Sequence, residues 1–221
     1  MPDPVTLTMQ DDVAIIDVDD GKANAIGFDV LEGFEAALEK AAEAKAVVVA
    51  GRPGKFSAGF DLSVIGGDRT LELMGRGGKL ALTMWELPAP LVFAVTGHAL
   101  AMGAVLLCCA DYRVGAAGDF KIGLNEIRIG LAVPPFATEV ARARLNPAHF
   151  NRATLLAEVY DPAGALEAGW LDEVVPLDQV RDRAIELATG WANDLKSGAF
   201  QATRRIARGA LAEQLRESLG L

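Results

Sequence analysis

The sequence predicts an α/β fold with parallel strand pairing, and two patterns carry that prediction. Strand, helix and strand follow one another between residues 13 and 50, a spacing that implies parallel pairing through a right-handed crossover. Residues 91–110 then form an apolar strand followed by a segment that is apolar on every face, as in a helix enclosed by protein. We therefore expect a single core over residues 1–176 and a helical tail over residues 177–221.

The first elements follow from simple periodicities. Strands are expected over residues 5–9 and 13–17, joined by a tight polar turn, so the chain opens with a hairpin. A polar loop over residues 19–27 comes next. Apolar residues then recur at three- and four-residue intervals, which predicts an amphipathic helix over residues 28–45. The β-branched run AVVVA over residues 46–50 is the next strand.

The middle of the chain changes composition. Residues 63–78 are rich in glycine and carry interspersed charges, which predicts a mobile loop leading into a helix over residues 79–86. Pro88 and Pro90 then end that helix and precede the central strand over residues 91–95. The short apolar helix expected after it covers residues 102–110.

The last third of the chain is predicted to be mostly helical. A helix is expected over residues 135–145, and two more begin at Asn146-Pro147 and Asp161-Pro162, where an N-cap residue precedes proline at the first helical position. Residues 173–176 form a final short strand. The tail is expected to hold two helices separated near Ser197-Gly198, with arginines 204, 205 and 208 forming a solvated basic face.

Composition limits the function. Hydrophobic residues make up 51% of the chain, charged residues 23%, and the formal net charge is −9. That balance indicates an acidic soluble protein and excludes a nucleic-acid binder. A polyphosphate ligand would need local cations, and Lys22, Arg52 and Lys55 lie near the candidate loops described next. Cys108 and Cys109 are expected to be buried fillers rather than a redox pair or metal site.

No membrane segment or leader is expected. Residues 91–110 are long and apolar, but Thr96, Gly97 and His98 interrupt them, so strand followed by helix is favoured over a membrane span. The start, Met1-Pro-Asp-Pro, does not have the pattern of a signal peptide, and we therefore expect a cytoplasmic protein.

Two loops of small residues offer the same chemistry. One follows the strand over residues 46–50, and the other precedes the buried helix that begins near Met102. The first N–H groups of a helix have no partner inside it and lie at the positive end of its dipole. Two such loops facing one another would give two N–H donors to one carbonyl oxygen, which predicts an oxyanion site.

Three blocks in these regions, FSAGFDL at 56–62, AVTGHALAMGAVLLCCADYRV at 94–114 and GLNEIRIGL at 123–131, resemble the signature blocks of the crotonase superfamily, the enoyl-CoA hydratases and isomerases. In spacing they are most similar to the enoyl-CoA isomerase branch and to short bacterial hydratase-like proteins. The resemblance runs from about Val5 to about Val180. It implies a ββα spiral core and a helical C-terminal tail that covers the acyl site and joins the subunits of a homotrimer or dimer of trimers. In such an assembly arginines 204, 205 and 208 could reach the coenzyme A phosphates of a neighbouring subunit, and the solvated basic face is favoured over that role. It also implies an acyl-CoA substrate, with coenzyme A as part of the thioester and no metal or tightly bound cofactor.

The resemblance also assigns roles to residues. The two oxyanion donors would be the N–H groups of Ala58 and Met102, with Gly103 beside the latter, and Glu126 would be the base. Val105 stands where hydratases carry their first glutamate, and valine neither binds nor deprotonates water. One base that takes a proton from C2 and returns it at C4 suffices for 3-enoyl-CoA to 2-enoyl-CoA isomerisation.

The loop over residues 19–27 would line the adenine end of the coenzyme A site, where Lys22 is either a phosphate contact or a plain exposed lysine. The apolar loop that includes Pro134 would wall an acyl tunnel. The expected coenzyme A and substrate contacts are Lys22, Ala23, Ala25, Ser57, Gly59, Phe60, Asp61, Leu62, Val105 and Pro134.

Two alternatives remain open at this point. The first is a hydratase whose second acid comes from the glycine-rich loop, for example Asp68 or Glu72. The second is a non-catalytic acyl-CoA-binding protein that kept the fold, consistent with Met102 in place of the usual glycine and with the short tail. His98 is expected to make a structural hydrogen bond that fixes the turn before the buried helix.

Overall fold

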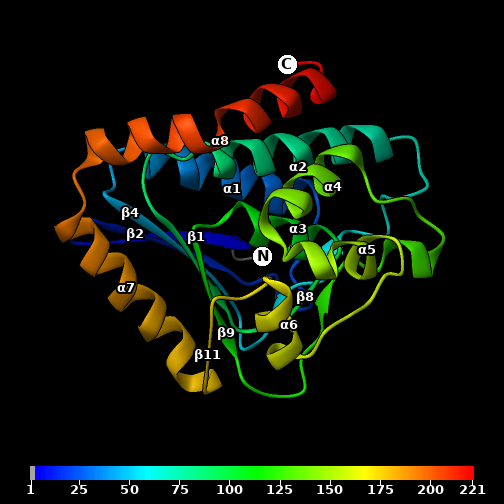
Figure 1. The fold of residues 1–221 in the computed structure, drawn as a ribbon, viewed down its shortest axis with the longest axis horizontal. Coiled ribbons are helices and arrows are strands. Elements are labelled where there is room, and N and C mark those ends of the chain that lie inside the picture. The colour runs from blue at the N-terminus through cyan, green and yellow to red at the C-terminus, as the bar shows by residue number, and fades with distance from the viewer. Residues whose placement is uncertain (1–2) are drawn as a thin grey trace.

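Six strands form the main sheet of the computed structural model, which describes residues 3–221 (Figure 1). All neighbouring strands pair in parallel except the opening hairpin of β1 and β2, as expected. Met1 and Pro2, part of the start discussed above, lie outside the described residues. In spatial order the strands are β1 (Val5–Gln10), β2 (Val13–Val18), β4 (Ala46–Gly51), β7 (Leu91–Val95), β9 (Tyr112–Ala116) and β11 (Glu173–Val175).

Two smaller sheets carry the loops of interest. One consists of β10 (Ile122–Gly123), β8 (Gly97–Leu100) and β5 (Gly54–Ser57), and the other pairs β3 (Ala25–Ile26) with β6 (Gly59–Phe60). Strand β8 replaces the simple turn expected after β7. It approaches β5 backbone to backbone, because a Cβ atom on Gly97 would lie 2.0 Å from the carbonyl carbon of Gly54. Glycine at position 97 is therefore a packing requirement.

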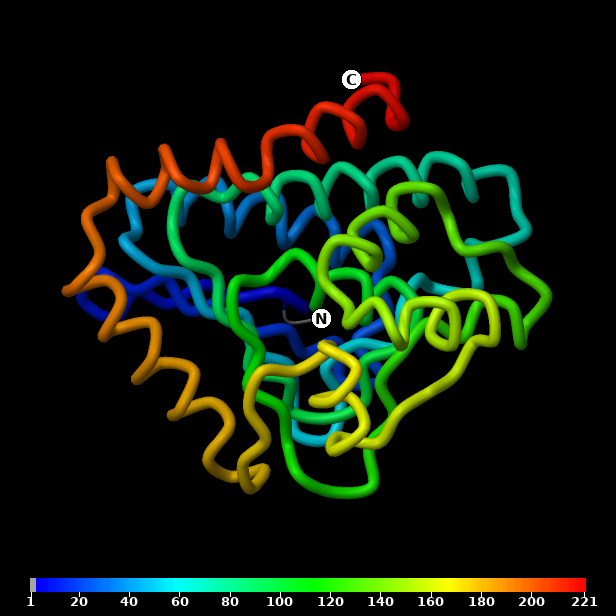
Figure 2. The backbone as a smooth tube through the Cα atoms, in the orientation of Figure 1, coloured from blue at the N-terminus to red at the C-terminus, as the bar shows by residue number. Residues whose placement is uncertain are grey.

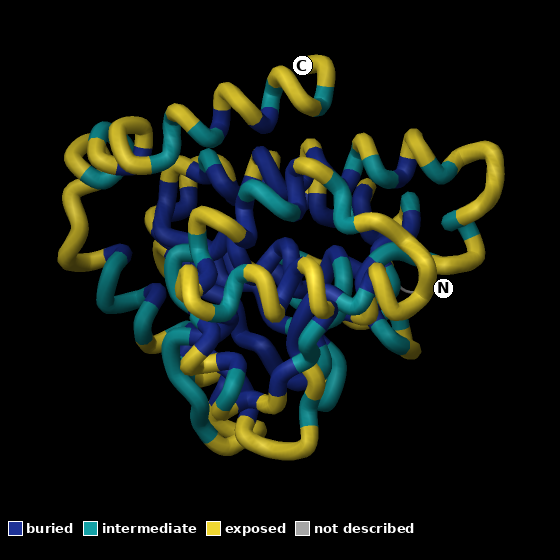
Figure 3. The backbone as a smooth tube through the Cα atoms, turned by 45° about the vertical axis from the view of Figure 1, so that its right-hand side comes forward, coloured by how far each residue is buried: buried dark blue, intermediate teal, exposed yellow. Residues whose placement is uncertain are grey.

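Alternating strand residues divide the core into two layers. Residues such as Val48 and Val92 face α7 (Val180–Asp194), which presents Val180 and three alanines at four-residue spacing. The intervening residues, such as Val49 and Phe93, face α1 (Phe28–Lys40), α2 (Thr70–Trp85) and α3 (Met102–Cys109). Helix α3 is buried on all sides, as its uniform apolarity predicted, and Figure 3 shows the buried segments gathered there and in the sheet.

The glycine-rich segment over residues 63–78, predicted to be a mobile loop, is helical from Thr70 onward. Helix α2 begins at Thr70, nine residues before the expected start at Lys79, and contains Gly75, Gly77 and Gly78. Two of these glycines are needed for packing. A Cβ atom on Gly77 would lie 2.4 Å from the Phe60 ring, and one on Gly78 would lie 2.5 Å from Leu219. Tertiary contacts therefore outweigh the poor helix propensity of glycine here.

The helix-start signals of the last third are confirmed. The Asn146 side chain accepts from the Ala148 N–H at 3.0 Å, and the Asp161 side chain accepts from the Gly164 N–H at 2.7 Å. The helices are α4 (Pro135–Arg144), α5 (Pro147–Thr154), α6 (Pro162–Ala168) and α8 (Ser197–Leu219), with short 3-10 turns η1 (Glu126–Ile129) and η2 (Leu177–Gln179).

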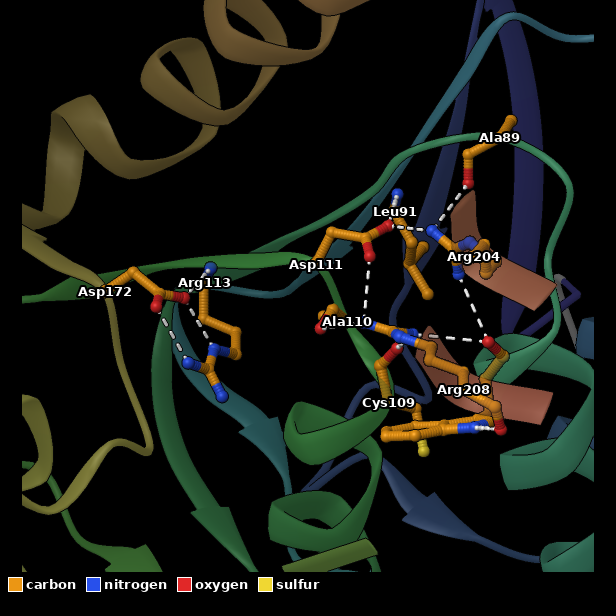
Figure 4. Close-up of polar contacts among 10 residues, drawn as sticks. Ala89, Leu91, Cys109, Ala110, Asp111, Arg113, Asp172, Arg204 and Arg208 are labelled. Carbon is orange, nitrogen blue, oxygen red and sulfur yellow. Dashed lines mark hydrogen bonds and ion pairs between the residues drawn. The ribbon is translucent and has the colours of Figure 1, made fainter. Parts of the chain in front are cut away.

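The arginines of the tail do not form the solvated face that was predicted. Helix α8 folds back over α2 of the same chain, which the tube view shows as the last segment running along the earlier helix (Figure 2). Arg204 is only 7% exposed, and Asp111, at the end of α3, accepts hydrogen bonds from both Arg204 and Arg208 (Figure 4). Among the three arginines only Arg205 is exposed. The two inner arginines attach the tail to the core.

Candidate active site

The two small-residue loops predicted to face one another are in contact. Gly59, the first residue of β6, has a φ of +92°, and a Cβ atom there would lie 2.7 Å from the Ala101 Cβ and 3.2 Å from the Met102 nitrogen. Only glycine fits both this backbone conformation and this approach. Gly103 has a similar constraint, because a Cβ on it would lie 2.7 Å from the Ser57 carbonyl oxygen. The first and second signature blocks therefore meet at one point.

The start of α3 exposes backbone donors at that point. Ala101 adopts φ 50° and ψ −125°, a strained conformation for a residue with a Cβ atom. The Val105 N–H donates to the Ala101 carbonyl at 3.0 Å, which is the first bond of the helix. Across residues 3–221, no acceptor is found for the Met102 N–H. It therefore has the free backbone donor expected at a helix start.

Ala58 does not have the free donor that was predicted. Its N–H donates to the Ala23 carbonyl at 3.0 Å. Three residues on, the Asp61 N–H donates to the Ile26 carbonyl at 3.1 Å, toward β3. Successive amides of a strand point in opposite directions, so the Phe60 N–H faces away from β3. The resemblance therefore placed this donor two residues too early, at Ala58 instead of Phe60. The direction of each main-chain N–H is set by the pairing of β3 with β6.

A cavity of about 330 Å³ opens beside these amides. Its walls are largely apolar, and its polar side chains are Thr70, Asn125 and Glu126. The lining comprises Ala58, Phe60, Leu62, Ile65, Thr70, Met74, Ala101, Met102, Val105, Asn125, Glu126, Ile129, Leu131, Ala132, Pro134, Phe136 and Ala137. Helices α2, α3 and α4 thus contribute together with η1. An apolar pocket with a few converging polar groups is the usual form of a small-molecule site.

Glu126 is held in this cavity by the small sheet. Strand β10 pairs with β8, and the Ala101 N–H donates to the Gly123 carbonyl at 3.0 Å, so the third signature block is tied to the start of α3. Glu126 begins η1 three residues later and is 7% exposed. Its Oε2 atom has no hydrogen-bond partner within the described chain. Burial raises the pKa of its carboxyl group, as the apolar neighbourhood predicted.

No second carboxylate lines this cavity. Val105, one turn into α3, occupies the wall where a second glutamate was considered. Neither acid of the hydratase alternative lies in the lining. Asp68 is exposed, and Glu72 is held outside by Arg69, which donates to both of its carboxylate oxygens at 2.8 Å. Glu126 is therefore the one acidic group in contact with this cavity among residues 3–221.

Asn24, which sequence reasoning missed, joins the predicted coenzyme A loop to the first block. It is fully buried at φ 51°, and its side-chain amide donates to the carbonyls of Val18, Lys55 and Phe56. The main-chain carbonyl of Asn24 accepts a hydrogen bond from the Ser57 hydroxyl at 2.7 Å. An asparagine between two alanines in a polar loop was the available signal, since asparagine tolerates positive φ better than most residues.

The predicted coenzyme A contacts lie near one another but differ in exposure. Lys22 is exposed. The guanidinium group of Arg52 already has partners within the chain, because it donates to the Lys22 main-chain carbonyl at 2.9 Å and pairs with Asp19 at 3.3 Å. Ala23 and Ala25 flank the buried Asn24. In this loop Lys22 thus has a side chain available to a phosphate.

The remaining predicted contacts fall into two groups. Leu62 and Pro134 line the cavity, Leu62 at its rim and Pro134 at the start of α4. Asp61 instead caps its own loop by accepting from the Ser63 N–H at 2.8 Å. His98 behaves as predicted, because its Nδ1 accepts from the Lys121 N–H at 2.9 Å and ties β8 to the segment before β10.

The sequence model of the enoyl-CoA hydratase/isomerase family matches residues 8–220. The chain belongs to this family. Its fold confirms the predicted membership of the crotonase superfamily and the α/β architecture with a helical C-terminal segment. The predicted enzyme class, an enoyl-CoA isomerase or hydratase, is likewise that of its relatives.

Several relatives in the enoyl-CoA hydratase/isomerase family are similar over nearly the whole chain. Mouse mitochondrial enoyl-CoA delta isomerase 1 is 31% identical, over 92% of this chain and 73% of that protein. A family protein from Pseudomonas syringae superposes with a TM-score of 0.95 at 38% identity, covering 99% of this chain and 96% of the other. An enoyl-CoA isomerase of Mycobacterium tuberculosis has a TM-score of 0.95 at 37% identity, with 100% and 97% covered.

The membrane and cysteine predictions can be compared with the described residues, 3–221. No helix within residues 3–221 is long and apolar enough to cross a membrane. Cys108 and Cys109 are buried and free, and burial raises the thiol pKa of both, that of Cys108 to about 11. They are fillers of α3, as expected from its composition.

Proposed function

We propose that this protein isomerises 3-enoyl-CoA to 2-enoyl-CoA with Glu126 as the base. The observation that carries the proposal is the single carboxylate, with an unpaired oxygen, in an apolar cavity beside the free backbone N–H of Met102. Moving a double bond by one position needs one group that removes a proton and returns it. Adding water needs a group that also holds and activates that water, and Val105 stands where such a group would lie.

The amides of Met102 and Phe60 bind the thioester oxygen in this proposal. Met102 supplies a free donor at the start of α3, and Phe60 replaces Ala58, whose amide is already bonded. Preorganised donors of this kind typically contribute roughly 3–4 kcal/mol each to stabilising an oxyanion. The substrate brings coenzyme A as part of its thioester, and no tightly bound cofactor is required. Lys22 is the proposed contact for its phosphates.

The reaction balances with these groups alone. Glu126 takes a proton from C2 of the 3-enoyl thioester, and the electron pair of that C–H bond delocalises onto the thioester oxygen as a dienolate. The same carboxyl group then returns the proton at C4, and the double bond moves to C2–C3. A base of raised pKa suits both halves, because it must accept a proton and then release it.

The proposal is tested with two substrates and two matched variants. Wild-type protein should convert 3-hexenoyl-CoA to 2-hexenoyl-CoA and should not hydrate crotonyl-CoA. Glu126→Gln should lower kcat by roughly 10²–10⁴-fold with little change in KM, as expected for loss of a proton-transfer group. Glu72→Gln is the control, because Glu72 is the rival acid and lies outside the cavity, and it should retain full activity.

The other outcomes distinguish the alternatives. Hydration of crotonyl-CoA without a double-bond shift, lost in Glu72→Gln and kept in Glu126→Gln, would establish the hydratase instead. Calorimetric binding of coenzyme A with no turnover of either substrate would establish a non-catalytic acyl-CoA-binding protein. A homotrimeric or dimer-of-trimers assembly and a cytoplasmic location belong to the proposal as predictions from the sequence.

A further inference from the structure

A second cavity lies where the tail crosses the end of α2, and it shares no residue with the active-site cavity. Its volume is about 290 Å³. One wall is the end of α2 with Trp85, Glu86 and Pro88, and the other is α8 from Gln201 to Ala212. Three arginines of α8 line it, Arg204, Arg205 and Arg208. The site is independent of the proposed function.

The charges in this second cavity do not balance. Arg204 and Arg208 share one carboxylate, that of Asp111 (Figure 4), which is not among the residues that line the cavity. Glu86 is the only acidic residue in the lining, and its Oε1 atom already accepts from Arg216 at 2.5 Å. Arg205 has no carboxylate within ion-pair distance in the described part of the chain. A chain of net charge −9 thus gathers uncompensated positive charge in one cleft.

Burial makes that excess costly. Arg204 is 7% exposed, and its Nε atom is buried with no partner among residues 3–221. Burial, together with the charge of Arg204, lowers the pKa of Arg208 to about 10 although Asp111 opposes the shift. Interactions between charges are stronger in such a partly desolvated cleft than in water. An anion that entered would therefore be attracted by several guanidinium groups at once.

The accessible donors and the apolar wall define the ligand. Gln201 and Arg205 are four residues apart on α8, so their side chains lie on the same face, and both line the cavity. No hydrogen bond occupies either side chain within residues 3–221. Behind them, Arg208 lies over the Trp85 ring at 4.3 Å, and Pro88 and Ala212 are apolar. This arrangement suits an anionic oxygen group, carboxylate or phosphate, attached to a small apolar body.

We propose that this cleft between α2 and α8 binds a small organic anion, with Arg205 and Gln201 as its direct contacts. The bound anion would bridge the tail to α2, the helix that also contributes Thr70 and Met74 to the active-site cavity. Binding should therefore raise the melting temperature, since a ligand that binds only the folded state stabilises it.

The test uses inorganic phosphate and butyrate as probes, titrated at constant ionic strength against chloride. The readouts are the melting temperature and tryptophan fluorescence, to which Trp85 in the cleft contributes together with Trp170 and Trp191. We expect saturable changes with at least one probe. Butyrate binding alone identifies a carboxylate ligand, phosphate binding alone a phosphate ligand, and binding of neither overturns the proposal.

Matched variants locate the site. Arg205→Gln should weaken binding about tenfold, as expected for loss of a charge-assisted hydrogen bond. Glu86→Gln, which removes the one negative charge of the lining, should strengthen it. Arg142→Gln, an exposed arginine of α4, should leave it unchanged. Equal affinity in wild type and Arg205→Gln, or displacement of the probe by coenzyme A, would place the anion elsewhere and refute the proposal.

Discussion

Replacing Asp111 by asparagine should destabilise the whole fold, because this carboxylate is the shared counter-ion of two buried arginines. Asp111 accepts from Arg204, from Arg208 and from the Leu91 N–H at 2.8 Å (Figure 4). The side chains of Arg204 and Arg208 are only 6% and 12% exposed. Asparagine keeps the size and one acceptor oxygen but removes the charge.

The size of the effect follows from burial. Removing one partner of a buried ion pair costs about 3–5 kcal/mol, because the other charge is left uncompensated. Asp111 itself is 23% exposed, so water screens part of that cost and we expect about 3 kcal/mol. Typical domains have roughly 5–15 kcal/mol of stability, so the loss is large.

The assay is urea unfolding of Asp111→Asn beside Glu72→Gln. Glu72 pairs with Arg69 at 2.8 Å on the surface, with 49% of its side chain exposed, and such solvent-screened pairs contribute little to stability. The two variants should therefore differ in urea midpoint with similar slopes. A loss in Asp111→Asn no larger than that in Glu72→Gln would show that the buried arginines do not depend on this carboxylate.

Three further predictions concern the site and its supports. Gly75→Ala should stabilise α2 by roughly 0.5–1 kcal/mol, since nothing lies near its added methyl group, whereas Gly77→Ala should cost roughly 1–3 kcal/mol by forcing the Phe60 ring to move. In urea unfolding the two variants should change the free energy of unfolding in opposite directions, and a change in the same direction would contradict this packing. Ala101→Gly should gain roughly 1 kcal/mol in the same assay by relieving the strain at φ 50°, with a loss of stability as the contrary result. Glu126→Gln should be more stable than wild type at pH 8 and equal to it near pH 4. Burial raises the pKa of Glu126 in the folded state above its value in the unfolded chain. Protonated Glu126 therefore contributes fully to the free energy of unfolding below the unfolded-state pKa, and this contribution is lost as the pH rises through the folded-state pKa. A constant difference between the two proteins across thermal melts from pH 4 to 8 would exclude this linkage.

Local patterns predicted most of the elements that carry the site. The β-branched run of β4, the uniform apolarity of α3 and the proline-marked helix starts depend on neighbouring residues, and all were predicted correctly. The first nine residues of α2 were missed because their glycines lower the local helix propensity, while the Phe60 ring and Leu219 that require Gly77 and Gly78 are distant in sequence. Strand β8 was missed because its partner, β5, lies more than thirty residues away.

By itself the sequence determined the family, the order of the helices and of most strands of the main sheet, and Glu126 as the candidate base, since residue types and short-range spacing specify these. Only the tertiary structure decided which amides remain free and where the tail's arginines lie. Pairing of β3 with β6 commits the Ala58 amide and turns that of Phe60 the other way, and the fold of α8 over α2 buries Arg204. A backbone N–H can donate one hydrogen bond and an arginine carries one charge. The acceptors and counter-ions that satisfy them lie on segments that come together only when the chain folds.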